Sequence, residues 1–438
     1  MQFSKDSSQK NILVLRTSDT SHQDKLVSNG VDTNISTTIS KTTAAQAKLM
    51  SQQQQKSGRW QGWLEAFQHV FPIYVATRIA FLLLTYLVSL FFFDNFSGQS
   101  RTLHDFIEQW NHWDTGQFTN IVQFGYNAPW RTAFFPLYPM LEALLTPLLH
   151  KPFYAGLVIS NLATLGLFLV LYRLVREESN EELATRTVLY LAVFPTAFFL
   201  AAAYNESLFL FLAVFSFYHI RRGNWWLAGL CGFLASLTRS AGVFLLVPFC
   251  YEYLRQHEFN LKRIRFSIVG GAFIPAGLAL FALYCYYKFH DFLAFSHAQV
   301  YWGRQLSKPW SGFTHALSII LKRPALTFDS IHNVLDLSAG LFMLLVLVLC
   351  FVGPWKFSRD RIVYGLYGVT FYLFLILFPA SGGFPLQSLS RLVLELFPAF
   401  LVLAMMGKRS AFNIYYLTIS ISVLAFMLLQ FLMGRWIV

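Results

Sequence analysis

The feature of this chain that most constrains its fold is a series of long apolar stretches that recurs from Ile73 to the C-terminus. Each approaches the ~20 residues that a helix needs to cross the hydrocarbon core of a bilayer. In lipid the backbone must pair with itself, which leaves helices and closed barrels, and these stretches lack the alternation of barrel strands. The sequence therefore predicts an all-α, polytopic membrane protein.

The apolar stretches predict about 10–11 transmembrane helices. The expected segments are 73–93, 134–149, 153–175, 184–203, 207–220, 225–253, 266–289, 335–351, 362–378, 392–406 and 414–432. The segment 225–253 is too long for one ordinary crossing, and the polar residues from Ser236 to Arg239 interrupt it. This pattern predicts a pair of short helices that meet near Arg239.

Charge predicts the orientation of the helices. The formal charge is +12, but Lys and Arg sit in short connectors rather than in one basic stripe, so nucleic acid is not an expected partner. The positive-inside rule assigns the basic connectors to the cytoplasm; they are Arg221-Arg222, 255–265, 356–361 and Lys408-Arg409. This parity requires either that the segment 134–149 re-enters without crossing or that Tyr172 to Arg176 breaks the rule.

The expected domains follow from the same patterns. Residues 1–60 are rich in Ser, Thr, Gln and Lys and are expected to form a disordered cytoplasmic tail. Residues 61–438 are expected to form the transmembrane domain. Within it, 94–132 is predicted to be the first extracytoplasmic loop, carrying short interfacial helices, and 290–334 the second large one.

The most informative motif lies in the first predicted loop and reads WNHWDTGQF from Trp110, followed by AFFPLYP from Ala133. If the motif is helical, Trp110, Asp114, Gln117 and Ile121 share one face. Asp114 would then lie between aromatic side chains. The simpler alternative is that this carboxylate caps a helix or pairs with a cation.

These motifs resemble the first extracytoplasmic loop of the PIG-V family, which contains the second mannosyltransferase of GPI-anchor assembly and its bacterial relatives. Three later stretches are similar to family segments in the same order: FPTAFF from Phe194, YNESLF from Tyr204 and LTRSAG from Leu237. The resemblance covers roughly Trp110 to Pro248. Beyond it, only the hydropathy and the Ser390-Arg391 pair match.

The resemblance implies a GT-C glycosyltransferase fold and a polyprenyl-phosphate-sugar donor, with Asp114 in the position of the catalytic base. A carboxylate within hydrogen-bond reach can take the proton of an acceptor hydroxyl as the new bond to C1 forms. Arg239 and Arg391 are the candidates that hold the leaving phosphate. Direct attack by the acceptor on C1 predicts a single-step transfer with inversion.

Four further residues are candidates for substrate contact, namely His112, Gln117, Asn205 and Glu206. Glu206 begins an apolar run, where its charge also suits a helix N-terminus. A structural pair between Glu206 and Arg239 is the simpler alternative for both. For Arg391, an alternative that we rate above phosphate contact is a side chain that extends to the membrane interface. The cluster from Tyr301 to Trp310 is interpreted as an interfacial aromatic belt, with the border of a donor groove as the alternative.

The expected activity is thus a membrane mannosyltransferase that acts on a lipid or glycan acceptor. A polytopic transporter or lipid flippase is the alternative, although no internal repeat favours it. No cofactor or metal is expected besides the lipid-phosphate co-substrate, since His and acidic residues are scattered and the four cysteines show no CxxC spacing. A bacterial plasma membrane is the preferred location, or the endoplasmic reticulum in a eukaryote. The sugar, the acceptor and protein partners are not readable from the sequence.

Overall fold

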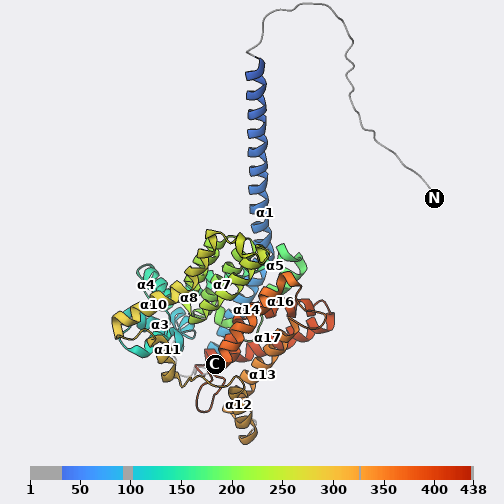
Figure 1. The fold of residues 1–438 in the computed structure, drawn as a ribbon. Helices are drawn as coiled ribbons and strands as arrows, with labels where there is room; N and C mark the ends of the chain where they lie inside the picture. The colour runs from blue at the N-terminus through green and yellow to red at the C-terminus, as the bar shows by residue number, and fades with distance from the viewer. Residues whose placement is uncertain (1–31, 92–101, 325–326, 436–438) are drawn as a thin grey trace, which may run out of the picture. The chain divides into compact units, whose positions relative to one another are not determined.

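The computed structural model describes residues 32–91, 102–324 and 327–435, with side chains from Trp60 onward. These residues form helices joined by short turns (Figure 1). Within these three stretches no β-strand is present, and the one pairing of extended backbone is an isolated antiparallel bridge between Arg304 and Ala380. The prediction of an all-α protein is confirmed.

Seventeen α-helices run through the described residues. They are α1 (Asp32–Phe91), α2 (Leu103–Glu108), α3 (Asp114–Phe124), α4 (Leu137–Leu149), α5 (Pro152–Glu178), α6 (Glu181–Ala192), α7 (Glu206–Arg221), α8 (Trp225–Thr238), α9 (Leu246–Gln256), α10 (Phe273–Phe289), α11 (Ala294–His297), α12 (Ser311–Lys322), α13 (Phe328–Leu349), α14 (Ile362–Ile376), α15 (Leu389–Leu392), α16 (Phe397–Met406) and α17 (Ser410–Leu432).

Five helical stretches in the described residues are long and apolar enough to cross a membrane: Trp60–Phe91, Pro152–Glu178, Phe266–Phe289, Phe328–Leu349 and Ser410–Leu432. A sixth is reached if Leu389–Glu395 and Phe397–Met406, bent by 82° at their junction, count as one span. The chain is an integral multipass membrane protein. The count falls below the predicted ten or eleven because several apolar segments fold as shorter or broken helices, as at Arg239, where α8 ends and α9 follows after a 3₁₀ turn.

The structure differs from the prediction of a disordered tail in the second half of residues 1–60. The helix α1 begins at Asp32, so residues 32–60 are helical rather than disordered. Residues 32–57 contain neither Pro nor Gly and include Ala, Gln and Lys, which favour helix. Residues 1–31 of the predicted tail lie outside the described residues. The chain divides into two units, and the membrane fold belongs to the second, Gly62–Val438.

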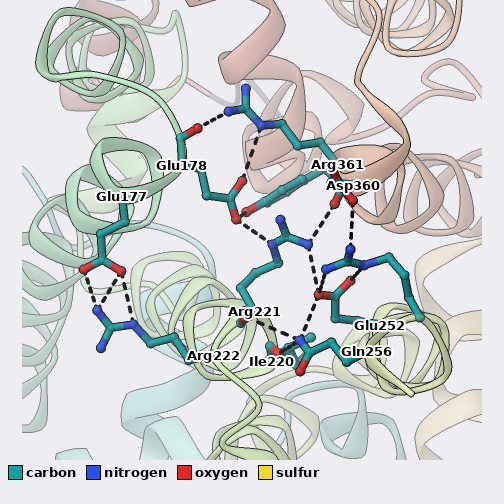
Figure 2. A network of polar contacts seen from close by, with 11 residues as sticks. Glu177, Glu178, Ile220, Arg221, Arg222, Glu252, Gln256, Asp360 and Arg361 are labelled. Atoms are coloured by element: carbon teal, nitrogen blue, oxygen red, sulfur yellow. Dashed lines mark hydrogen bonds and ion pairs between the residues drawn. The ribbon is translucent and has the colours of Figure 1, made fainter. Parts of the chain in front are cut away.

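A network of ion pairs joins one end of four helical segments (Figure 2). Arg221, at the end of α7, binds Glu178 of α5 at 2.5 Å and Glu252 of α9 at 3.0 Å, and it donates to the Asp360 carbonyl at 2.8 Å. Arg222 pairs with Glu177, and Arg361 with Glu178. These contacts bring three of the four predicted cytoplasmic connectors together, and Arg409 of the fourth lies over the Trp355 ring. The prediction that the basic connectors share one side is therefore confirmed.

The contacts of α5 bear on the two alternatives for the segment 134–149. The C-terminal end of α5 joins the ion-pair network, whereas Lys151, just before its start, lies 3.4 Å from Glu108 of the first loop. Both ends of α4 therefore lie on the side of the first loop. Its 13 residues would span about 20 Å, less than a hydrocarbon core. These contacts and the length of α4 favour the alternative in which the segment 134–149 re-enters without crossing.

Helix α8 packs against the 3₁₀ turn Phe266–Ala272 and α10 through glycines, as membrane helices commonly do. A Cβ atom on Gly229 would lie 1.9 Å from the carbonyl oxygen of Gly270, so the two backbones can approach this closely only without a side chain there.

We expect Gly229→Ala to lower the free energy of unfolding by about 1–3 kcal/mol, since the added methyl group forces these backbones apart. The midpoint of thermal unfolding in detergent measures the effect. Gly116→Ala is the matched control, because a Cβ atom there meets nothing within 4 Å and alanine favours the helix. Equal stability of both variants would contradict the close contact.

Candidate active site

A cavity of about 360 Å³ lies at the end of the membrane domain opposite the ion-pair network. The first loop and α3 contribute Trp113, Asp114 and Gln117 to its wall, and the later segments contribute Arg239, Arg304 and Arg391. Its volume is within the range of pockets that hold small ligands. Polar and charged groups from distant parts of the sequence thus meet in one space.

Asp114 is the first residue of α3, where the helix dipole favours a negative charge. The preceding Trp113 has a φ of 48°, a left-handed conformation that is strained for a bulky residue. Packing maintains this strain: the Trp113 ring lies 5.4 Å from the ring of Phe431 in α17. The Thr115 hydroxyl donates to the Ala203 carbonyl at 3.3 Å, and the Tyr204 hydroxyl to the His112 carbonyl at 3.1 Å. The loop is therefore fixed on both sides of Asp114.

Arg391 connects the two acidic groups that the sequence singled out. Its Nη1 donates to Asp114 Oδ2 at 2.8 Å, and its Nε lies 3.4 Å from Glu206 Oε1. The side chain is 11% exposed, so the expectation that it extends to the membrane interface is wrong. The two carboxylates hold this guanidinium inside the protein.

The backbone around Arg391 is fixed by its neighbours. The amide of Ser390 donates to Asp336 Oδ1 of α13 at 2.9 Å, and the Thr196 hydroxyl donates to the Ser390 carbonyl at 2.9 Å. Thr196 belongs to the FPTAFF motif, so this motif helps to fix the backbone next to Arg391.

Arg239 forms the second bridge. Its Nη1 lies 3.0 Å from Glu206 Oε1 and 2.8 Å from Glu395 Oε1, and it also donates to Asn205 Oδ1 at 3.2 Å. The Asn205 amide donates in turn to the Thr238 carbonyl at 3.1 Å. The YNESLF and LTRSAG motifs are thus tied to each other. The alternative of a structural pair between Glu206 and Arg239 is what the structure contains.

The predicted face of the first-loop helix is only partly correct. Asp114, Gln117 and Ile121 lie on α3, and both Asp114 and Gln117 line the cavity. Trp110 precedes the helix instead and is buried, with its Nε1 donating to Thr85 Oγ1 at 3.1 Å. The chain turns between α2 and α3 because Trp113 leaves helical geometry.

Two predicted contact residues do not line the cavity. The His112 ring packs against Trp113 and Phe431, and burial lowers its pKa below the ordinary value, which favours a neutral ring at pH 7. Glu206 is 1% exposed and lies behind the two arginines that it holds. By contrast, Asn205, Arg239 and Arg391 line the cavity.

Two charged residues of the cavity were not predicted from the sequence. Glu395 lies in the predicted span 392–406 and is 1% exposed. An acidic side chain inside an apolar span is costly to bury and therefore indicates a partner. This feature of the sequence could have identified Glu395. Arg304 belongs to the cluster interpreted as an aromatic belt. Tyr301 and Trp310 of that cluster are exposed at 71% and 60%, but Arg304 and Trp302 line the cavity.

The charged groups of the site are arranged as pairs of opposite sign. Its three carboxylates, on Asp114, Glu206 and Glu395, each face an arginine. Across the described stretches of chain, no group of three or more His, Cys, Asp or Glu side chains is arranged to hold a metal ion.

Comparison with known proteins relates part of the chain to a family. The family model described as mannosyltransferase (PIG-V) matches residues 93–303. GPI mannosyltransferase 2 of Yarrowia lipolytica is 29% identical over 139 residues, which are 30% of this chain and 39% of the relative. GPI alpha-1,6-mannosyltransferase 2 of Mus musculus is 30% identical over 146 residues, which are 30% of this chain and 29% of the relative. The matches span well under half of these relatives.

The similar solved structures share little sequence identity with this chain. ArnT from Cupriavidus metallidurans, bound to undecaprenyl phosphate, superposes with a TM-score of 0.43 at 13% identity, over 69% of this chain and 66% of that one. The Archaeoglobus fulgidus oligosaccharyltransferase in complex with Zn and sulfate gives 0.38 at 11% identity, over 75% and 49%. The family model covers the motifs between Trp110 and Pro248 that carry the resemblance, so this part of the chain is similar to the PIG-V mannosyltransferases.

Proposed function

We propose that the protein is a mannosyltransferase that moves a mannosyl group from a polyprenyl-phosphate donor to the hydroxyl of a lipid-linked or glycan acceptor. The observation that carries the proposal is the Asp114 carboxylate, which faces a cavity that two further arginines line. The similarity to GPI mannosyltransferases supports mannose as the sugar.

The proposed reaction is a single displacement. The acceptor oxygen attacks C1 of the mannosyl group, the bond from C1 to the phosphate oxygen breaks, and the proton of the acceptor hydroxyl passes to Asp114. Only Oδ2 of Asp114 is engaged by Arg391 in the described contacts, which leaves Oδ1 for the acceptor. The polyprenyl phosphate leaves as an anion, so the site needs cations more than an acid.

Arg391 has two effects in this scheme. It orients the Asp114 carboxylate, and in the proposed reaction its positive charge also stabilises the leaving phosphate. The ion pair also makes Asp114 a weaker base than a free carboxylate, a cost that accurate placement of the acceptor must offset. We expect the reaction on the extracytoplasmic side, since the cavity lies at the end opposite the basic connectors. Which membrane contains the protein stays a prediction from the sequence: a bacterial plasma membrane, or the endoplasmic reticulum in a eukaryote.

The test is transfer of radiolabel from polyprenyl-phosphate-mannose by the purified full-length protein in nanodiscs with a crude lipid-acceptor extract. We expect a labelled glycolipid whose mannosidic linkage has the anomeric configuration opposite to that of the donor, which NMR of the product determines. Retained configuration would contradict the single displacement. Tight donor binding without transfer, also with other sugars, would instead favour the transporter alternative.

A further inference from the structure

The three arginines that line the cavity are not equivalent. Arg239 and Arg391 each lie within 4 Å of two carboxylates, so their charges are already balanced inside the protein. Arg304 forms no ion pair with any carboxylate in the described parts of the chain. Its guanidinium makes one described hydrogen bond, from Nη2 to the Gln387 carbonyl at 3.2 Å.

The position of Arg304 is nevertheless well fixed. Its backbone pairs with Ala380, the neighbouring Gly303 carbonyl accepts from the Ser381 amide at 2.8 Å, and the Arg304 amide donates to the Gln299 carbonyl at 3.0 Å. The second outer loop is thereby attached to the segment between α14 and α15. An arginine held at its backbone, with most of its donors unused, is suited to binding a ligand.

The local charges also favour an added anion at Arg304. Burial, and then the positive charges of Arg391 and Arg239, lower the pKa of Arg304 to about 10. An anion beside Arg304 would oppose the positive charges of these two arginines. The indole Nε1 of Trp302, which also lines the cavity, is buried without an acceptor among the described residues. A second unused donor thus lies close to Arg304 in the sequence.

We propose that Arg304 binds the phosphate group of the polyprenyl-linked substrate, with Trp302 as a second hydrogen-bond donor. This inference rests on the proposed function and refines it. A phosphodiester carries one negative charge and presents free oxygens, which match the fork of a guanidinium. In this assignment Arg391 and Arg239 organise the carboxylates, and Arg304 provides the cation that has no partner of its own.

The test measures binding of polyprenyl phosphate and of uncharged polyprenol to the full-length protein in nanodiscs, by quenching of tryptophan fluorescence. We expect wild type to prefer the phosphate, and Arg304→Gln to weaken phosphate binding by ~10–100-fold without changing polyprenol binding. Arg304→Lys keeps the charge but loses the fork, so an intermediate affinity is expected. Arg323→Gln is the matched control, since Arg323 pairs with Asp329 outside the cavity.

The outcomes separate the two proposals. If wild type prefers the phosphate and Arg304→Gln binds it equally well, the assignment of Arg304 is wrong and the proposed function stands. If wild type shows no preference over polyprenol, the polyprenyl-phosphate donor itself is contradicted. Equal Arg304-dependent binding of phosphatidic acid would assign the residue to membrane phospholipids and overturn the proposal. If Arg304→Gln does not fold, the Arg304→Lys variant provides the test. If it binds polyprenyl phosphate as tightly as wild type does, the bidentate contact is contradicted.

Discussion

Replacing Asp114 with asparagine is expected to slow mannosyl transfer by ~10²–10⁴-fold, the usual contribution of a positioned general base. Asparagine has nearly the same shape as aspartate, and its carbonyl oxygen can still accept the hydrogen bond from Arg391. It cannot take the proton of the acceptor hydroxyl. Single-turnover transfer from radiolabelled donor measures the rate, and donor affinity measured in parallel should change far less.

The matched control for Asp114→Asn is Asp105→Asn. Asp105 belongs to the same loop but forms the cap of α2 outside the cavity, so its replacement should leave the rate of transfer unchanged. A thermal unfolding midpoint close to that of wild type shows that the Asp114→Asn variant is folded. A folded variant that transfers at more than a tenth of the wild-type rate would remove Asp114 from the role of base.

Features that depend on local sequence were largely predictable. The apolar stretches predicted the helices, and the polar residues before Arg239 predicted the break between α8 and α9. The basic connectors predicted a shared side, because membrane insertion sorts Lys and Arg irrespective of the details of packing. The conformation of Trp113 was not predictable, since its positive φ depends on tertiary contacts such as that with Phe431 in α17.

Several residues that line the cavity could be singled out from the sequence, but most of their pairings could not. Asp114, Asn205, Arg239 and Arg391 all line one cavity, yet the ion pair between Asp114 and Arg391 joins positions 277 residues apart. The sequence suggested a pair of Glu206 with Arg239, but charge alone could not decide which acid faces Arg391. Arg304 was grouped with its aromatic neighbours because a cation beside Tyr and Trp is typical of a membrane interface. Backbone contacts with the segment around Ala380 and Ser381 bring it to the cavity.

The second large effect is expected from Arg239→Met, which should lower the free energy of unfolding by about 3–5 kcal/mol. Glu206 and Glu395 are both 1% exposed and share Nη1 of this arginine. Glu206 would keep Arg391 at 3.4 Å, but Glu395 would have no cationic partner within the described residues. An unpaired buried carboxylate is costly, so the arginine stabilises the fold whether or not it also contacts substrate.

A second substitution tests this cause. Adding Glu395→Gln to Arg239→Met replaces the unpaired carboxylate by a neutral amide and should recover a large part of the lost stability, as measured by unfolding in detergent. Arg222→Met, which breaks a more exposed pair with Glu177, should cost about 1 kcal/mol or less. If Arg239→Met is instead as stable as wild type but loses affinity for polyprenyl phosphate, Arg239 is a substrate ligand. In that case pairing with the buried carboxylates would not explain the presence of Arg239, and Arg239 and Arg304 would bind the phosphate together.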